Sequence, residues 1–507
     1  MKTKRFHLFL LPLLLACCIG SGAGEQKSAG VRPPAFAGQF YPSEAGRLKS
    51  AIQQFLDDAV SVKADNPVAI VVPHAGYLYS GQIAADGYRQ VKGSNFDVVV
   101  ILGTNHVSGS LTGISVYPSG AYRTPLGEAP VDEAVAGALI KEDKDCSADA
   151  ALQRTEHSIE VQVPFIQTLF PAARIVPVMI GTPDPAMCTR LGAALGKILK
   201  GTRVLIVASS DLSHFPKYED ACDTDRQTLA VIAGFDPAQF VSKAKSLMGR
   251  NTPNLDTCAC GEAPIIAAMT AAKSLGATRG VVVSYANTAD LVPQDRFRVV
   301  GYGSVVFAAG EAIPDTKALD RPAAPPPSGP LQAADKKALL KIARQSLQRF
   351  LATETVPLVR NLSPRLQFPQ GVFVTLKERG ELRGCIGHLA GDFPVGQTTA
   401  WMAVQAGLND PRFPAVTLKE LPALEIEISV MTPMKSVAKA TDIVIGRDGV
   451  VIEKAGRSAV FLPQVATEQG WGLGEMLDNL CLKAGLPRDA WKSGAQFKVF
   501  QADIFKE

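Results

Sequence analysis

The sequence predicts an α/β fold, and three observations lead to this prediction. Apolar runs at 68–72, 98–103 and 204–208 have the continuous hydrophobic character of strands buried on both faces, as in a parallel sheet. Patterns typical of helices alternate with these runs, which favours a three-layer α/β/α arrangement. The 507 residues exceed the size at which a single core usually stops growing, so a second domain is expected.

The elements of the first domain, residues 33–309, can be placed in order. A helix is expected over 44–59, followed by the strand at 68–72, a helix near 81–90 and the strand at 98–103. Later strands are expected at 204–208 and 280–284, and a last strand at 298–307 would complete the sheet. Parallel strands present their carboxyl ends at one edge, where open α/β sheets bind ligands.

A proline-rich segment separates the two domains. Residues 310–332 carry many prolines and few large apolar side chains, and are predicted to form a semi-extended linker. The second domain, residues 333–507, opens with a helix over 333–351. Strands are expected at 371–376, 424–430 and 450–453, and the alternating pattern of 424–430 predicts an α+β fold with an antiparallel sheet.

The N-terminus resembles a secretory leader. Lys2, Lys4 and Arg5 precede an apolar stretch too short to span a membrane, so residues 1–24 are predicted to be a signal peptide. The segment that ends in Cys17 resembles the bacterial lipobox, which predicts lipidation of Cys17; an ordinary signal peptide is the alternative. We therefore expect an exported bacterial protein, either lipid-anchored to the membrane or periplasmic, in which disulfides are permitted.

Charge and histidine content indicate the class of function. The formal net charge of only +4 is not that of a strongly basic nucleic-acid binder, so the expected ligand is a small molecule.

Four of the six histidines, His74, His106, His157 and His214, lie in patterned segments of the first domain. Because His74 and His106 follow predicted neighbouring strands, a metal site with open positions is expected there. A satisfied core histidine is the alternative for either residue alone.

Several motifs of the first domain resemble the Memo family. They are PHAGY (73–77), ILGTNH (101–106), EHSIEVQVPF (156–165), SSDLSH (209–214) and a Cys260-Gly261 pair. Members of this family share their fold with the class III extradiol dioxygenases. The resemblance implies that His74, His106 and Cys260 are metal ligands, with Asp211 and His214 in the same pocket.

Roles for the remaining pocket residues follow from chemistry and from this resemblance. A thiolate at Cys260 makes the site suitable for copper as well as iron(II), and a buried or disulfide-bonded thiol is the alternative. His214 is the candidate general acid or base, with Asp211 expected to influence its charge. Glu156, His157 and Tyr77 are expected in the pocket or behind the ligands, while a capping or salt-bridge role for the Glu156 segment is equally compatible.

The second domain resembles the AMMECR family. The resemblance rests on LRGCIG (382–387), DPRFP (410–414), LEIEISV (424–430), AVFLPQVATEQGW (459–471) and LCLKAGL (480–486). Arg383 and Cys385 are candidates to line a pocket, but no base with an orienting partner accompanies Cys385. A structural strand cysteine is therefore favoured.

The fusion suggests three hypotheses for function. AMMECR-like, Memo-like and radical-SAM proteins are known as the three parts of the AmmeMemoRadiSam system, and any radical-SAM partner of this chain would be a separate protein. The first hypothesis is an iron-dependent oxidoreductase or dioxygenase acting on a small aromatic substrate. The second is a protein that binds copper or iron without turnover, and the third is a ligand-binding scaffold.

Overall fold

The computed structural model describes residues 30–310 and 331–507. The predicted signal peptide with Cys17 and nearly all of the predicted linker lie outside the described residues. Among the described residues, no helix has the length and apolar character needed to cross a membrane.

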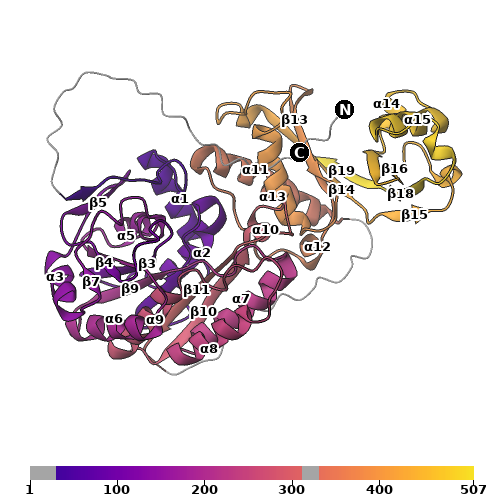
Figure 1. Ribbon diagram of the computed structural model, residues 1–507. Coiled ribbons are helices and arrows are strands. Elements are labelled where there is room, and N and C mark those ends of the chain that lie inside the picture. The colour runs from indigo at the N-terminus through magenta and orange to yellow at the C-terminus, as the bar shows by residue number, and fades with distance from the viewer. Residues whose placement is uncertain (1–29, 311–330) are drawn as a thin grey trace, which may run out of the picture.

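An eight-stranded sheet forms the centre of the first domain (Figure 1). Its middle four strands are parallel and lie in the order β2 (Pro67–Val72), β9 (Val204–Ser209), β3 (Val98–Thr104) and β8 (Arg174–Ile180). Their side chains are almost entirely buried, which explains their continuous apolar sequences. All four carboxyl ends consequently reach the same edge of the sheet.

Two further strands flank the four parallel strands on each side, and each flank joins them by an antiparallel pair. β11 (Gly301–Ala308) pairs antiparallel with β2, and β10 (Arg279–Asn287) pairs antiparallel with β11. On the other side lie β4 (Ile114–Val116) and β7 (Cys146–Ser147). The last strand begins at Gly301 and not at the predicted residue 298, because the chain just before it is bonded to the His214 loop: Phe215 N–H donates to the Val299 carbonyl.

Helices cover both faces of the sheet, so the predicted three-layer α/β/α fold is confirmed (Figure 1). One layer contains α1 (Ala45–Asp57) and α2 (Tyr77–Arg89). The other contains α6 (Pro185–Ile198), α7 (Tyr218–Ala233), α8 (Pro237–Met248) and α9 (Glu262–Ser274). The Glu44 carboxylate caps α1 by accepting from two backbone N–H groups, whereas α2 begins four residues before its predicted start.

The second domain contains two four-stranded antiparallel sheets, which confirms the predicted α+β class. The first sheet has the order β13 (Glu381–His388), β12 (Val372–Glu378), β14 (Leu424–Met431) and β19 (Ala502–Lys506). The second has the order β15 (Lys435–Val437), β18 (Gln496–Phe500), β16 (Gly449–Lys454) and β17 (Arg457–Phe461). α11 (Ala333–Thr353) and α13 (Val395–Leu408) pack against each other beside the first sheet, and α15 (Leu473–Lys483) packs beside the second.

The two domains share a hydrophobic cluster. Ile83, Leu291 and Tyr302 of the first domain belong to the same buried cluster as Leu339 and Val395 of the second. The domains are therefore packed against each other and not merely tethered.

Candidate metal centre

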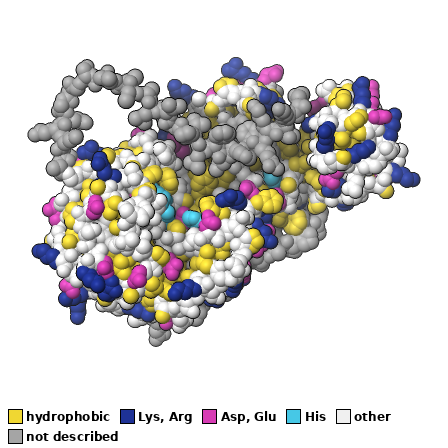
Figure 2. Space-filling model, viewed as in Figure 1, with side chains coloured by type: hydrophobic (Ala, Val, Ile, Leu, Met, Phe, Trp, Pro, Cys, Tyr) yellow, Lys and Arg dark blue, Asp and Glu magenta, His cyan; other side chains and the backbone are white. Residues whose placement is uncertain are grey.

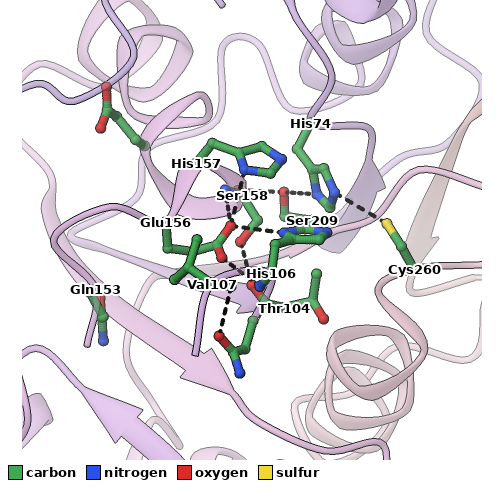
Figure 3. Close-up of polar contacts among 12 residues, drawn as sticks. His74, Thr104, His106, Val107, Gln153, Glu156, His157, Ser158, Ser209 and Cys260 are labelled. Carbon is green, nitrogen blue, oxygen red and sulfur yellow. Dashed lines mark hydrogen bonds and ion pairs between the residues drawn. The ribbon is translucent and has the colours of Figure 1, made fainter. Parts of the chain in front are cut away.

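The carboxyl ends of β2, β3 and β9 bring the predicted site residues together (Figure 3). His74 follows β2 and His106 follows β3, and their ring centroids lie 5.1 Å apart. Figure 2 shows histidine side chains at the surface of the first domain, and His106 is the exposed member of this cluster. The site is thus open to small molecules on the His106 side.

His74 presents one nitrogen to Cys260 and uses the other for a structural hydrogen bond. The Ser209 hydroxyl donates to the Ser158 carbonyl (2.6 Å), so it accepts from His74 Nδ1, 3.0 Å away. This network leaves a lone pair on His74 Nε2, which lies 3.2 Å from Cys260 Sγ. Burial lowers the pKa of His74 well below its usual value, so the imidazole is neutral.

The spacing of His74 and Cys260 fits two ligands of one metal. With bond lengths of about 2.0–2.1 Å to nitrogen and about 2.3 Å to sulfur, the two ligand atoms would be about 3.1 Å apart at a right angle and about 3.6 Å apart at the tetrahedral angle. Burial and the Asp211 charge raise the pKa of the Cys260 thiol well above its usual value. A metal ion would replace this proton.

Glu156 orients His106. Its carboxylate lies 2.9 Å from His106 Nδ1 through Oε1, and its Oε2 accepts the His106 backbone N–H at 2.7 Å. The Glu156 side chain is fully buried; burial raises its pKa, but the hydrogen bond and charge of His106 bring the pKa down to about 2. His106 Nε2 is thereby directed away from the carboxylate, in the arrangement typical of metal-bound histidines.

His157 joins the two predicted imidazole ligands. It begins α4 (His157–Glu160), stacks on His106 with centroids 4.5 Å apart and lies 5.3 Å from His74. Ligand atoms of these three histidines lie within 4.8 Å of one another, as do those of His74, Asp211 and Cys260. His157 was expected in the pocket or behind the ligands, and its position beside His74 and His106 makes it a third candidate imidazole ligand.

Asp211 fixes the His74 backbone. Its Oδ1 accepts from the N–H groups of His74 (2.8 Å) and Ala75 (3.3 Å), and burial raises its pKa to about 6. The expected influence of Asp211 on His214 is absent from the described contacts; the carboxylate that raises the pKa of His214 is Asp256.

His214 lies beside this cluster with a free nitrogen. Its Nε2 is buried and has no hydrogen-bond partner among the residues that the structure describes. Burial, followed by the charge of His106, lowers its pKa to about 4. The side chain is therefore neutral near pH 7 and able to accept a proton from a bound molecule.

Tyr77, which was expected in the pocket or behind the ligands, lies in the core. Its hydroxyl donates to the Val161 carbonyl (2.8 Å), and its ring packs among Tyr41, Phe55 and Phe165 in the core. The residue begins α2, and the first turn directs it towards the neighbouring helices.

Two further residues support the site, and of these the sequence did not single out Ser209. Ser209 sets the tautomer of His74, and Glu160 anchors the segment before α1 by accepting from the N–H groups of Ala35 and Phe36. Glu160 also pairs with buried Arg32 at 2.5 Å. Both residues lie in motifs that the sequence reveals: Ser209 opens SSDLSH, and Glu160 ends EHSIE.

The second-domain candidates make structural contacts. Arg383 pairs with Glu420 at 2.8 Å, and Cys385 accepts a hydrogen bond from Thr375 at 3.2 Å. His388 pairs with Asp392, an orienting partner that the sequence did not reveal. The contacts agree with the favoured structural role of Cys385. All seven cysteines among the described residues are free, so no disulfide involves Cys260.

Comparison with known proteins identifies both domains. The model of the Memo-like protein family matches residues 32–306, more than half of the chain. The chain belongs to the Memo-like family. A second family model, AMMECR1, matches residues 340–505 of this Memo-like protein, so the predicted Memo/AMMECR fusion is confirmed.

Curated relatives match the Memo-like half. MEMO1 family proteins from Caldivirga maquilingensis and Methanosarcina mazei are each 34% identical to this chain, over 54% of its length and 98% of theirs. A MEMO1 family protein from Methanobrevibacter smithii is 35% identical, over 55% of this chain and 99% of its own. A solved structure of an uncharacterised protein from Pyrococcus horikoshii is 36% identical, covering 33% of this chain and 89% of that chain, with a TM-score of 0.31.

Proposed function

We propose that this Memo-like protein is a non-haem iron(II)-dependent oxidoreductase acting on a small aromatic substrate. The observation that carries the proposal is the convergence of imidazole and thiol ligands at the open edge of the sheet. His74 and His106 each use Nδ1 for a protein contact and keep Nε2 for a metal, and Cys260 Sγ faces the Nε2 of His74.

The protein side chains define the chemistry around such a metal. Bound iron would supply a redox centre with open positions for substrate oxygens and O2. Glu156 holds the His106 ring, and Asp211 holds the backbone that carries His74. Neutral His214 would take the proton of a phenolic hydroxyl at Nε2, which the described residues leave without a partner.

The donor set also supports a second function, binding of copper without turnover. Thiolate and imidazole together suit copper, whereas oxygen ligands would favour harder ions. The observation that favours this alternative is that His74 belongs both to the three-histidine group and to the group that contains the Cys260 thiol.

Metal analysis of the anaerobically purified full chain distinguishes these functions. We expect stoichiometric iron and O2 uptake with a panel of catechols, both lost in the His74→Ala/His106→Ala double variant. His388→Ala, which changes a histidine of the second domain, should retain both properties. Copper without turnover would support metal binding alone. Absence of a bound metal, or unchanged metal content in the double variant, would contradict the ligand assignment.

A separate variant tests the proton-transfer role of His214. His214→Asn should retain metal because the imidazole is outside both candidate ligand groups. Loss of one general acid or base typically lowers turnover by about 10²–10⁴-fold, and we expect a decrease of this size in O2 uptake. Unchanged turnover with retained metal would remove His214 from the mechanism.

A further inference from the structure

The loop between β13 and α13 of the second domain contacts segment 296–301 of the first domain. Phe393 of this loop is only 2% exposed and shares a buried cluster with Val299. The adjacent Asp392 carbonyl accepts from Arg296 Nη1 at 2.9 Å. The AMMECR-like domain therefore holds this segment through an apolar contact and a hydrogen bond.

Arg296 is also bound to its own domain. Its Nη2 pairs with Glu219 at 2.6 Å, and its guanidinium carbon lies 3.7 Å from the centre of the Tyr218 ring. The Arg296 carbonyl accepts from the Tyr218 N–H at 2.8 Å. Arg296 thus connects the start of α7 to the β13–α13 loop of the second domain.

The His214 loop, residues 211–216, pairs with the same segment 296–301. The backbone of Val299 donates to this loop at 3.0 Å and accepts from it at 2.8 Å, and Gly301 makes a similar pair of bonds, both of 2.8 Å. These backbone hydrogen bonds connect the segment that the second domain contacts to the candidate metal centre.

The His214 loop in turn holds two candidate metal ligands. Its Asp211 carbonyl accepts from the Cys260 N–H at 3.3 Å, and the His214 N–H donates to the Thr257 carbonyl at 3.1 Å. The Asp211 carboxylate accepts from the His74 N–H at 2.8 Å. A displacement of this loop would consequently move the backbone of both Cys260 and His74.

Phe215 of the His214 loop has an unfavourable backbone conformation. Its φ of +69° lies in the left-handed region, which residues with a side chain seldom adopt. Such a conformation persists only where the surrounding structure maintains it. The hydrogen bond from the Phe215 N–H to the carbonyl of Val299, which packs with Phe393, supplies part of this support.

We propose that the AMMECR-like domain positions the candidate metal centre, with Arg296 and Phe393 as positioning residues. Docking of the β13–α13 loop on segment 296–301 holds the His214 loop, and with it the candidate ligands, in the arrangement that binds metal. The effect on iron rests on the proposed function, whereas the link between the second domain and the His214 loop can be measured without iron.

Hydrogen–deuterium exchange of the metal-free full chain measures this link. Arg296→Ala and Phe393→Ala should each speed exchange in residues 211–216 by about tenfold, the effect of losing roughly one net hydrogen bond. The increase should be confined to this loop and to residues 257–260 and 296–301, which distinguishes local release from global unfolding.

Two further variants serve as controls. Phe393→Leu refills much of the apolar volume and should restore most of the protection that Phe393→Ala removes. Arg47→Ala removes the exposed interdomain pair with Glu354 and should leave exchange in the His214 loop unchanged. Thermal unfolding followed by circular dichroism shows whether each variant is folded, and Arg296→Ala, at a partly exposed side chain, still tests the link if Phe393→Ala is not.

Iron(II) affinity provides the second measurement. Competition with a chromophoric chelator under anaerobic conditions should show a decrease of roughly 10–100-fold in Arg296→Ala and Phe393→Ala, the effect typical of losing support behind a ligand. Because coupling between sites is reciprocal, iron(II) should slow exchange of the β13–α13 loop in the original chain. If the original chain binds no iron, the ligand assignment of the proposed function fails, and the exchange experiment still decides whether the second domain holds the loop.

Unchanged exchange of the His214 loop in the folded variants would overturn the proposal. Faster exchange with unaltered iron affinity would also contradict it, because the loop would then move independently of the ligands. An equal effect of Arg47→Ala would show that any loss of interdomain contact loosens the loop, which would remove the specific role of Arg296 and Phe393.

Discussion

At the scale of single residues, the candidate metal centre depends on what each imidazole does with its second nitrogen. Ser209 accepts from His74 because its own hydroxyl proton is committed to the Ser158 carbonyl. Glu156 performs the same task for His106 with a negative charge. Both partners direct Nε2 into the site, so they influence metal affinity without contacting the metal.

Glu156→Gln should therefore weaken metal binding while leaving all candidate ligands in place. Replacing one carboxylate oxygen by an NH₂ group removes the charge and places a donor beside the N–H groups of His106. Loss of such a partner typically costs about 10–100-fold in metal affinity, and competition with a chromophoric chelator would measure it. Glu128→Gln, at an exposed ion pair with Arg123, is the matched control. Equal affinities in the two variants would show that Glu156 does not support the ligand.

At the scale of elements, the end of β3 must approach α4 closely. A Cβ atom at Gly103 would lie 2.5 Å from Ile159 Cγ1 and 2.7 Å from Ser158 Oγ, so only glycine fits. At Gly76 the nearest contact would be 3.6 Å, an ordinary van der Waals distance. The close packing of neighbouring side chains therefore requires glycine at position 103 but not at position 76.

Alanine substitutions at these two glycines should differ in their effects. Gly103→Ala pushes α4, and with it His157 and the adjacent Glu156, away from β3. We expect a loss of about 1–3 kcal/mol in the free energy of unfolding, together with reduced metal content. Gly76→Ala should preserve both quantities, as measured by urea denaturation and metal analysis. A normal metal content in Gly103→Ala would show that α4 tolerates displacement.

The turn after α13 supports β13 through an acidic side chain. Asp410 accepts from the backbone N–H of Cys385 (2.8 Å) and from Arg412 Nη2 (2.7 Å). The Arg412 guanidinium, together with these backbone contacts, holds the pKa of Asp410 well below its usual value. The unfolded chain, with an ordinary pKa of about 3.9, therefore binds the proton more readily than the folded one.

This pKa difference predicts a specific pH dependence. The stabilisation by Asp410 should be complete above about pH 5 and should decline as the pH falls through 4 and below. Asp410→Asn should lower the free energy of unfolding at pH 7. The difference between the variant and the original chain should narrow towards pH 3 in urea denaturation. A difference that is constant with pH would show that the carboxylate charge is unimportant.

Features that depend on neighbouring residues could be predicted from the sequence, whereas features that depend on contacts between distant residues could not. The strands that carry His74 and His106 were predictable because burial on both faces leaves a continuous apolar run in the sequence. The position of β11 between β10 and β2 could not be predicted, because contacts between residues far apart in the chain decide which strands pair. For the same reason the motif could not show that Tyr77, expected in the pocket or behind the ligands, packs its ring against Phe165 in the core.

At the scale of the whole molecule, ion pairs accompany the shared hydrophobic cluster between the domains. Arg360 of the second domain contacts both carboxylate oxygens of Asp86 on α2, whose side chain is completely buried. Arg47 and Glu354 form another interdomain pair, but both side chains are about half exposed. The two pairs should therefore contribute very differently to the free energy of unfolding.

Removal of Arg360 should destabilise the packed molecule strongly. Arg360→Ala leaves the Asp86 carboxylate buried without its cation, which typically lowers the free energy of unfolding by about 3–5 kcal/mol. Arg47→Ala removes a surface pair, which lowers it by only about 0–1 kcal/mol.

Two spectroscopic signals can follow the domains separately. All three tryptophans, Trp401, Trp471 and Trp491, lie in the second domain, so their fluorescence reports its unfolding, while far-ultraviolet circular dichroism reports both domains. If the domains stabilise each other, the two signals should change together in urea for the original chain and separate in Arg360→Ala. Coincident transitions and equal stabilities in both variants would instead show that the apolar cluster alone holds the domains together.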